Sequence, residues 1–125
     1  MLISVKDTQK YGRGIYATCN IKIGELIESS PIILVNKEEL QFLAPTKISN
    51  YWFYWGQNSS ERAIALGYGS LFNHSYSPNC IYYYNERDLT IKFYALTNIK
   101  QGDEIKINYN GDPYDYSPLW FDIIN

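Results

Sequence analysis

The alternation of apolar and polar residues predicts a chain built mainly of short strands. Residues 2–7 (LISVKD) and 14–21 (GIYATCNI) have the period-2 pattern of strands and flank the turn sequence KYGRG. Residues 80–96 form two further strand-like runs around the turn NERD, and residues 98–109 form a turn and a strand. Residues 22–35 indicate a turn at Ile23–Gly24, followed by extended chain that Ser-Ser-Pro interrupts.

Only one segment has a clear helical signature. Asn36 is a plausible N-cap for residues 36–44, Glu39 follows three residues later as in a capping box, and Pro45 ends the segment. Residues 49–56 (SNYWFYWG) are too aromatic to be assigned to helix or strand by periodicity. The tail after residue 109 is rich in turn residues and aromatics.

These elements favour a mainly β domain with few short helices. Strands and helices do not alternate, so the chain is not a doubly wound nucleotide-binding fold. Gly12-Arg13-Gly14 precedes a strand-like run and not a helix, which argues against a dinucleotide or phosphate loop. With 125 residues and no repeat or linker, the chain is expected to form one domain over residues 1–125.

Composition narrows the class of function. The thirteen Tyr, five Phe and three Trp suit β-structure and flat-walled pockets. A net charge of -2 without a basic stripe argues against direct nucleic-acid binding. Two distant cysteines cannot assemble a structural zinc site, so no bound metal is expected. Both cysteines are expected to be reduced thiols. Without a signal peptide or membrane span, an intracellular location, cytoplasmic or nuclear, is expected.

Three segments, in order, resemble the SET-domain protein-lysine methyltransferases. They are YGRGIYATCNIKIGELI at 11–27, LFNHSYSPNC at 71–80 and ALTNIKQGDEIKINY at 95–109. Residues 65–75 (ALGYGSLFNHS) are especially similar to the minimal SET domains of large DNA viruses, which lack flanking zinc modules. The resemblance implies a β-clip-like SET fold of several small sheets with a C-terminal pseudoknot. It divides the chain into an N-terminal SET part (1–35), a variable insert (36–66) and a C-terminal part (67–125).

The resemblance also implies a reaction, a cofactor and site residues. The chain would transfer a methyl group from S-adenosyl-L-methionine to a lysine side-chain amine, with Tyr109 and Tyr68 as catalytic residues. The cofactor would be held by Arg13, Gly14, Asn73, His74, Tyr109 and Trp120, with Phe121 as the alternative to Trp120. The substrate lysine would be contacted by Tyr54, Ile107, Tyr114 and Tyr116. For Tyr54, Tyr114 and Trp120, plain packing in an aromatic core remains an equal alternative.

The chemistry of the residues agrees with this reaction. A lysine must be neutral to attack a methyl group, and its pKa is about 10.4 in water. Aromatic walls and a neighbouring positive charge lower that pKa, and tyrosine hydroxyls can orient the nitrogen without a charged base. The chain has many tyrosines, a single histidine and no evident acid–base cluster, so this mechanism suits it better than hydrolysis.

The chain differs from the usual family pattern at Tyr76, at Ile107 and in the tail after Tyr109. Tyr76 stands where the family usually has cysteine, and no three-cysteine segment follows Tyr109. Closure of the site by tail aromatics is therefore expected in place of zinc. Ile107 stands where an aromatic residue often restricts methylation in the family, so room for di- or trimethylation is expected.

The expected substrate is an extended lysine-containing tail of a histone or chromatin protein, bound by strand-like pairing. The alternative function is a non-catalytic SET-like module that binds a peptide or protein. Tyr109 and the Asn73–His74 pair distinguish the two, because a decayed member would be expected to lose one of them. A homodimer is an open alternative to a monomer, since a domain this small has a modest core.

Overall fold

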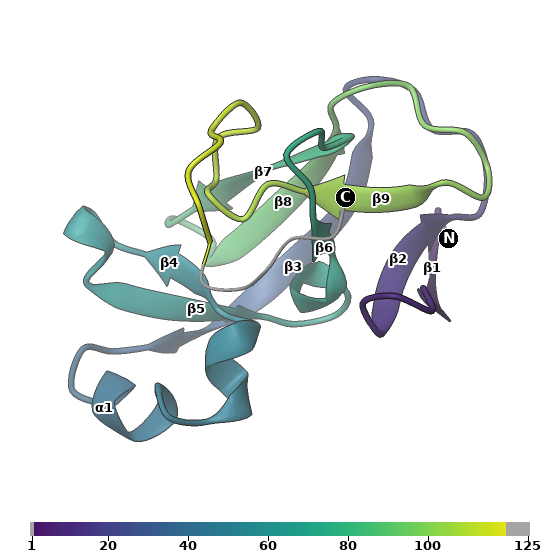
Figure 1. The fold of residues 1–125 in the computed structure, drawn as a ribbon. Helices are drawn as coiled ribbons and strands as arrows, with labels where there is room; N and C mark the ends of the chain where they lie inside the picture. The colour runs from purple at the N-terminus through teal and green to yellow at the C-terminus, as the bar shows by residue number, and fades with distance from the viewer. Residues whose placement is uncertain (1, 120–125) are drawn as a thin grey trace. The chain divides into compact units, whose positions relative to one another are not determined.

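A computed structural model describes residues 2–119 of the chain (Figure 1). The predicted class is confirmed: within these residues the structure is mainly strands, arranged in more than one sheet, with few and short helices. The strands are β1 (Ile3–Asp7), β2 (Arg13–Ala17), β3 (Leu26–Val35), β4 (Phe53–Trp55), β5 (Glu61–Ala65), β6 (Asn73–His74), β7 (Cys80–Asn85), β8 (Thr90–Ala95) and β9 (Glu104–Ile107). The helical elements are α1 (Leu40–Leu43) and the 3-10 turns η1 (Lys47–Asn50), η2 (Gln57–Ser59) and η3 (Gly69–Leu71).

The chain divides into two compact units. The first unit contains residues up to Ile27, the segment Leu71–Tyr82 and the described residues from Phe93 onward. The second unit contains Glu28–Ser70 and Tyr83–Lys92. Strands β3, β7 and β8 are therefore each divided between the units. The expected single domain over 1–125, with its insert at 36–66, stays a prediction.

The first unit is built on a four-stranded sheet with the order β1-β2-β9-β6. β1 and β2 pair antiparallel from Ile3↔Ala17 to Asp7↔Arg13, as the two predicted runs around the KYGRG turn require. Ile15 lies opposite Ile105 in the β2–β9 pair, and both side chains are fully buried. The rings of Phe72 and Phe93 stack 4.6 Å apart and add the largest side chains to this core.

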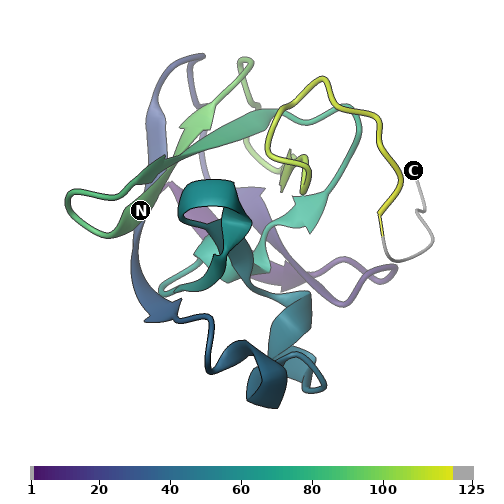
Figure 2. The ribbon, with the colours of Figure 1, turned by 90° about the vertical axis from the view of Figure 1, so that its left-hand side faces the viewer.

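The second unit is centred on β5, which pairs antiparallel with β3 on one side and with β4 on the other. These strands belong to a five-stranded sheet of order β4-β5-β3-β8-β7. Ala63 and Ala65 of β5 are buried, and the ring of Trp55 lies 5.4 Å from that of Tyr84. The helical turns that connect β3 to β4 are drawn in blue and teal in Figure 2.

Two local expectations need correction. The expected helix over 36–44 is reduced to the four residues of α1, although both capping-box hydrogen bonds between Asn36 and Glu39 are present. None of the residues of α1 is buried, so packing does not extend the capped turn into a longer helix. The expected interruption at Ser-Ser-Pro is also wrong, because β3 runs through Pro31, whose carbonyl accepts a hydrogen bond from the Leu66 N–H at 2.9 Å.

Candidate active site

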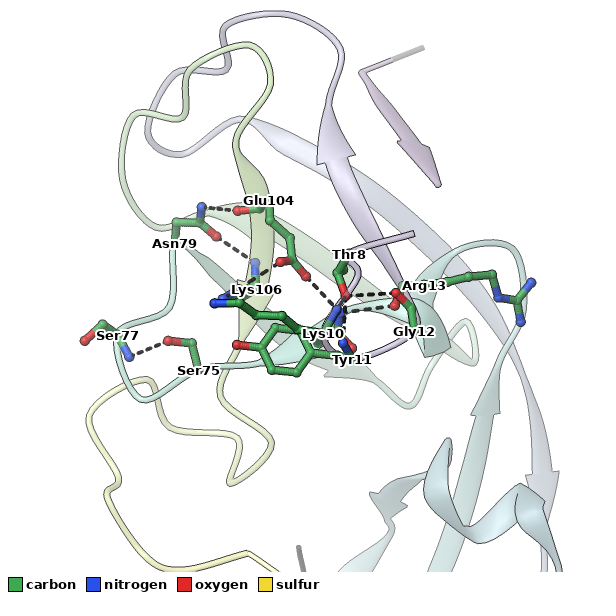
Figure 3. Close-up of polar contacts among 11 residues, drawn as sticks. Thr8, Lys10, Tyr11, Gly12, Arg13, Ser75, Ser77, Asn79, Glu104 and Lys106 are labelled. Carbon is green, nitrogen blue, oxygen red and sulfur yellow. Dashed lines mark hydrogen bonds and ion pairs between the residues drawn. The ribbon is translucent and has the colours of Figure 1, made fainter. Parts of the chain in front are cut away.

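The polar loop after β6 is hydrogen-bonded to β9. β6 pairs in parallel with β9, with His74 opposite Ile107, and the Ser75 N–H donates to the Ile107 carbonyl at 2.9 Å. Asn79 continues this pairing with its side chain: its Oδ1 accepts the Lys106 N–H at 2.8 Å and its Nδ2 donates to the Glu104 carbonyl at 2.9 Å (Figure 3). Polar side chains in this loop therefore satisfy backbone groups of β9 that no regular strand pairs with.

Tyr109, which follows β9, is held by this loop at two points. Its N–H donates to His74 Nδ1 at 3.0 Å, and its hydroxyl donates to the Phe72 carbonyl at 2.7 Å. The His74 and Tyr109 rings lie 5.2 Å apart. The predicted catalytic tyrosine and the predicted Asn-His pair are therefore brought together within the first unit.

His74 is a neutral side chain at physiological pH. It is only 7% exposed, and burial lowers its pKa to about 4. Because Nδ1 accepts a hydrogen bond from the Tyr109 N–H, the single ring proton of the neutral form lies on Nε2. This geometry makes His74 a hydrogen-bonding support for Tyr109.

Asn73 and Gly14 meet where β2, β6 and β9 adjoin. Asn73 Nδ2 donates to the Arg13 carbonyl at 3.1 Å and to Glu104 Oε2 at 2.8 Å. A Cβ on Gly14 would lie 2.6 Å from Glu104 Oε2 and 2.8 Å from Asn73 Nδ2. Gly14 thus leaves room for the protein's own polar contact, which sequence reasoning did not foresee. The predicted contacts of Arg13, Gly14 and Asn73 with a cofactor stay predictions.

The C-terminal segment is fixed over the same loop by side chains that sequence analysis did not place in the site. Asn108, only 2% exposed, donates through Nδ2 to the Asp115 carbonyl at 2.7 Å. The Tyr76 hydroxyl and Asn110 Nδ2 donate to the Ser117 carbonyl at 2.8 and 3.0 Å. The two asparagines on either side of Tyr109 were a visible signal, because amide side chains commonly bond backbone groups in turns.

An aromatic row runs from Tyr109 toward the tail. The Tyr76 ring meets His74 edge-on at 4.6 Å and lies 6.0 Å from the Tyr116 ring. Tyr114 and Tyr116 are both largely exposed, at 72% and 69%. Their predicted contacts with a substrate stay predictions, as does the pseudoknot. Trp120, predicted to cover the adenine, and its alternative Phe121 lie outside the described residues.

The remaining predicted site residues lie in different surroundings. Ile107 is fully buried in β9. Tyr68 and Tyr54 belong to the second unit: the Tyr68 N–H donates to Glu28 Oε2 at 2.9 Å, and the exposed Tyr54 ring lies 4.3 Å below the Arg62 guanidinium. The predicted roles of all three stay predictions.

The described residues contain neither a candidate metal site nor a candidate membrane-spanning helix. Among residues 2–119, no three His, Cys, Asp or Glu side chains are grouped so that they could hold a metal ion. Cys19 and Cys80 are both free thiols, and burial raises the pKa of Cys80. No helix in the same part of the chain is long and apolar enough to cross a membrane.

Comparison with known proteins defines the class to which this fold and site belong. The family model of the SET domain matches residues 12–110, which include β2, the β6 loop, β9 and Tyr109. The chain therefore belongs to the SET-domain family, and the resemblance to SET-domain protein-lysine methyltransferases is confirmed. Its further similarity to the minimal viral forms stays a prediction.

Particular relatives are histone-lysine methyltransferases. A Schizosaccharomyces pombe histone-lysine N-methyltransferase specific for H3 lysine-37 is 35% identical over 121 residues, covering 96% of this chain and 77% of the relative. A Coccidioides immitis histone-lysine N-methyltransferase specific for H3 lysine-36 is 28% identical over 93% of this chain, which spans only 12% of that relative. A crystal structure of a Plasmodium falciparum protein assigned as a histone methyltransferase has a TM-score of 0.70 and 29% identity, over 88% of this chain and 98% of that one.

Proposed function

We propose that this chain transfers a methyl group from S-adenosyl-L-methionine to a lysine side chain of a histone or another chromatin protein. The observation that carries the proposal is the double attachment of Tyr109 to the β6 loop, through its N–H and through its hydroxyl. These contacts restrain the tyrosine that the motif segments match to the family's catalytic tyrosine. The names of the relatives support the choice of a histone substrate and, with it, a nuclear location.

The residues present fit the proposed cofactor. Its positive sulfur, its ammonium group and its hydroxyls need hydrogen-bond acceptors and aromatic surfaces. The site offers the Arg13 and Phe72 carbonyls, the Asn73 amide and the rings of His74, Tyr76 and Tyr109. We infer that Arg13, Gly14, Asn73, His74 and Tyr109 would hold the cofactor. When bound, it supplies a methyl group on a positively charged sulfur.

Tyr109 orients the lysine amine in this proposal. Its only hydroxyl proton is donated to the Phe72 carbonyl, so toward any further group the oxygen acts as an acceptor. An N–H of a neutral lysine can donate to that oxygen, which turns the nitrogen lone pair away from the tyrosine. Holding a nucleophile in one orientation is a large part of the acceleration that positioning gives.

The neutral amine is favoured by the surroundings and not by a charged base. His74 is neutral and its Nδ1 is occupied by the Tyr109 N–H, so its role in the proposal is structural. The positive charge of the bound cofactor and the exclusion of water from the site would both disfavour a charged amine, and the lysine loses its proton to solvent on entry. A rate that rises with pH above neutrality is the expected consequence.

The first test is transfer of labelled methyl groups to core histones and nucleosomes at about pH 8 to 9, where the neutral amine is more populated. We expect labelling by the wild type and a loss of at least about a hundredfold in Tyr109→Phe, since misplaced reacting atoms cost about that much. Tyr51→Phe, a hydroxyl deletion in the second unit, is the matched control and should be fully active. Full activity of Tyr109→Phe would contradict the assigned role, and no labelling of any chromatin protein would contradict the substrate.

A further inference from the structure

The side-chain amide of Asn73 has both of its donors committed within the protein. Its nitrogen carries two hydrogens, and Nδ2 donates to the Arg13 carbonyl at 3.1 Å and to Glu104 Oε2 at 2.8 Å. The only other polar atom of this amide is Oδ1. Asn73 can therefore present an acceptor to a ligand, and cannot present a donor while these two bonds exist.

Glu104 is the side chain that selects this orientation. An ionised carboxylate only accepts hydrogen bonds, so a flipped amide would place Oδ1 against a carboxylate oxygen at hydrogen-bond distance. The Arg13 carbonyl also requires a donor from the amide, but a backbone carbonyl carries no full charge. Charge-assisted hydrogen bonds are about twice as strong as neutral ones, so the Glu104 contact contributes most to the preference.

Glu104 is itself held in place from several sides. Its Oε1 lies 3.9 Å from Lys106 Nζ, and that ammonium lies 5.2 Å from the centre of the Tyr11 ring (Figure 3). Its carbonyl accepts the Asn79 side-chain amide. Its side chain is only 12% exposed, and its Oε2 occupies the space that a Cβ on Gly14 would take. A carboxylate this restrained can impose an orientation on its partner.

We propose that Glu104 is a positioning residue that acts through Asn73: it fixes the amide so that Oδ1 faces the cofactor and accepts a hydrogen bond from one of its donor groups. This rests on the proposed function, because it takes Asn73 to be a cofactor contact. Without the Glu104 carboxylate, the Asn73 amide is free to flip. A flipped amide places its NH₂ group, which is a donor, opposite the donor group of the cofactor. Cofactor affinity then falls although Glu104 makes no contact with the cofactor.

The test measures binding of S-adenosylhomocysteine, the product that remains after methyl transfer, by titration calorimetry. Glu104→Met removes the acceptor while keeping a side chain of similar length, and we expect about tenfold weaker binding, the equivalent of one hydrogen bond. Glu104→Gln retains an acceptor oxygen and should stay within about threefold of the wild type. Asp103→Asn, a loss of charge one residue away that keeps an acceptor for the Lys100 N–H, is the matched control and should bind normally.

A double-mutant cycle separates positioning from general damage to the fold. In an Asn73→Ala background, Glu104→Met should weaken binding no further, because the amide through which it acts is absent. Unchanged affinity in the single Glu104→Met variant would overturn the proposal, and so would an equal loss in both backgrounds. Thermal unfolding of each variant identifies a loss that comes only from a smaller folded fraction.

A second readout needs no ligand. In the unliganded wild type, both side-chain amide protons of Asn73 should be hydrogen-bonded, with well-separated NMR shifts and slow exchange with water. In Glu104→Met, one of them should lose both features. If the wild type fails to bind S-adenosylhomocysteine, the proposed cofactor use fails. Amide signals that do not respond to Glu104→Met would instead overturn the positioning by Glu104.

Discussion

At the scale of single residues, Gly14 is required because of space and not because of backbone conformation. It lies in β2 and is buried, and no positive φ angle is involved. A Cβ would meet Glu104 Oε2, Asn73 Nδ2 and Thr8 Cγ2 at 2.6 to 2.8 Å. These distances are shorter than ordinary van der Waals contact, so even a methyl group must displace the Asn73–Glu104 pair.

We therefore predict that Gly14→Ala destabilises the protein by about 1–3 kcal/mol, the usual cost of an overpacked site. Urea denaturation followed by circular dichroism measures the loss. Gly12 is the informative comparison, because a Cβ there meets nothing within 4 Å but its φ is +82°. Gly12→Asn should be tolerated better than Gly12→Ala, since Asn adopts positive φ more readily. At Gly14, by contrast, any side chain must displace neighbouring side-chain atoms. Wild-type stability in Gly14→Ala would contradict this account.

At the scale of elements, Tyr76 joins the C-terminal segment to the β6 loop. Its hydroxyl donates to the Ser117 carbonyl, while its ring stays against His74. The hydrogen bond and the ring contact can be separated by experiment, since phenylalanine keeps the ring alone.

Tyr76→Phe should loosen residues 115–117 while leaving the sheet of the first unit intact. The Ser117 N–H, which donates to Asp115 Oδ1, reports on this segment. We expect its hydrogen exchange to be about fivefold to tenfold faster, because one lost hydrogen bond contributes about 1 kcal/mol. Amides of the β1–β2 pair should exchange as before. Tyr116→Phe, whose ring is 69% exposed, is the control for removal of a hydroxyl. Equal exchange in Tyr76→Phe and the wild type would show that the Tyr76 bond does not hold the segment.

Local elements were predictable from the sequence where their signals are local. The β1–β2 and β7–β8 runs alternate in polarity around turn sequences, and both pairs of strands appear where expected. The capping box between Asn36 and Glu39 is present, but α1 begins only at Leu40 and none of its residues is buried, so a correct local signal overstated the length of the helix. β6 has only two residues and pairs in parallel with a strand some thirty residues later, which no local pattern encodes.

The candidate site was predictable only for those residues that lie in recognisable sequence motifs. Tyr109, Asn73 and His74 were found through three motif segments, and the structure brings them together. Glu104, Asn108 and Tyr76 were missed, because their roles depend on contacts between segments that are distant in sequence. Residue type alone gives no reason to connect Tyr76 with the Ser117 carbonyl.

At the scale of the whole molecule, the single histidine links folding stability to pH. Burial lowers the His74 pKa to about 4 in the folded protein, from about 6.5 in an unfolded chain. Between these values the unfolded state binds a proton that the folded state does not, so stability falls as pH falls. Above about pH 6.5 both states are neutral at this residue, and its contribution no longer changes with pH.

We predict that the free energy of unfolding decreases between about pH 6.5 and pH 4 by at most ~3 kcal/mol through His74. Protonation would also place a donor at Nδ1, opposite the Tyr109 N–H that donates to it now. Carboxylates with lowered pKa values, Asp88 and Asp115, lose most of their contribution below their ordinary value of 3.8 and so affect only the acid end of this window. Urea titrations at half-unit pH steps measure the slope.

His74→Asn is the matched variant, because an asparagine Oδ1 can accept the Tyr109 N–H in the place of Nδ1 but does not titrate in this range. It should have a lower stability at pH 7, where the ring contacts with Tyr76 and Tyr109 are lost, and a flatter profile between pH 6.5 and 4. Wild-type stability that stays constant over this interval would mean that His74 titrates alike in the folded and unfolded states. The site would then accommodate a charged imidazolium beside Tyr109, and the support that His74 gives to the tyrosine N–H would have to be rearranged on protonation.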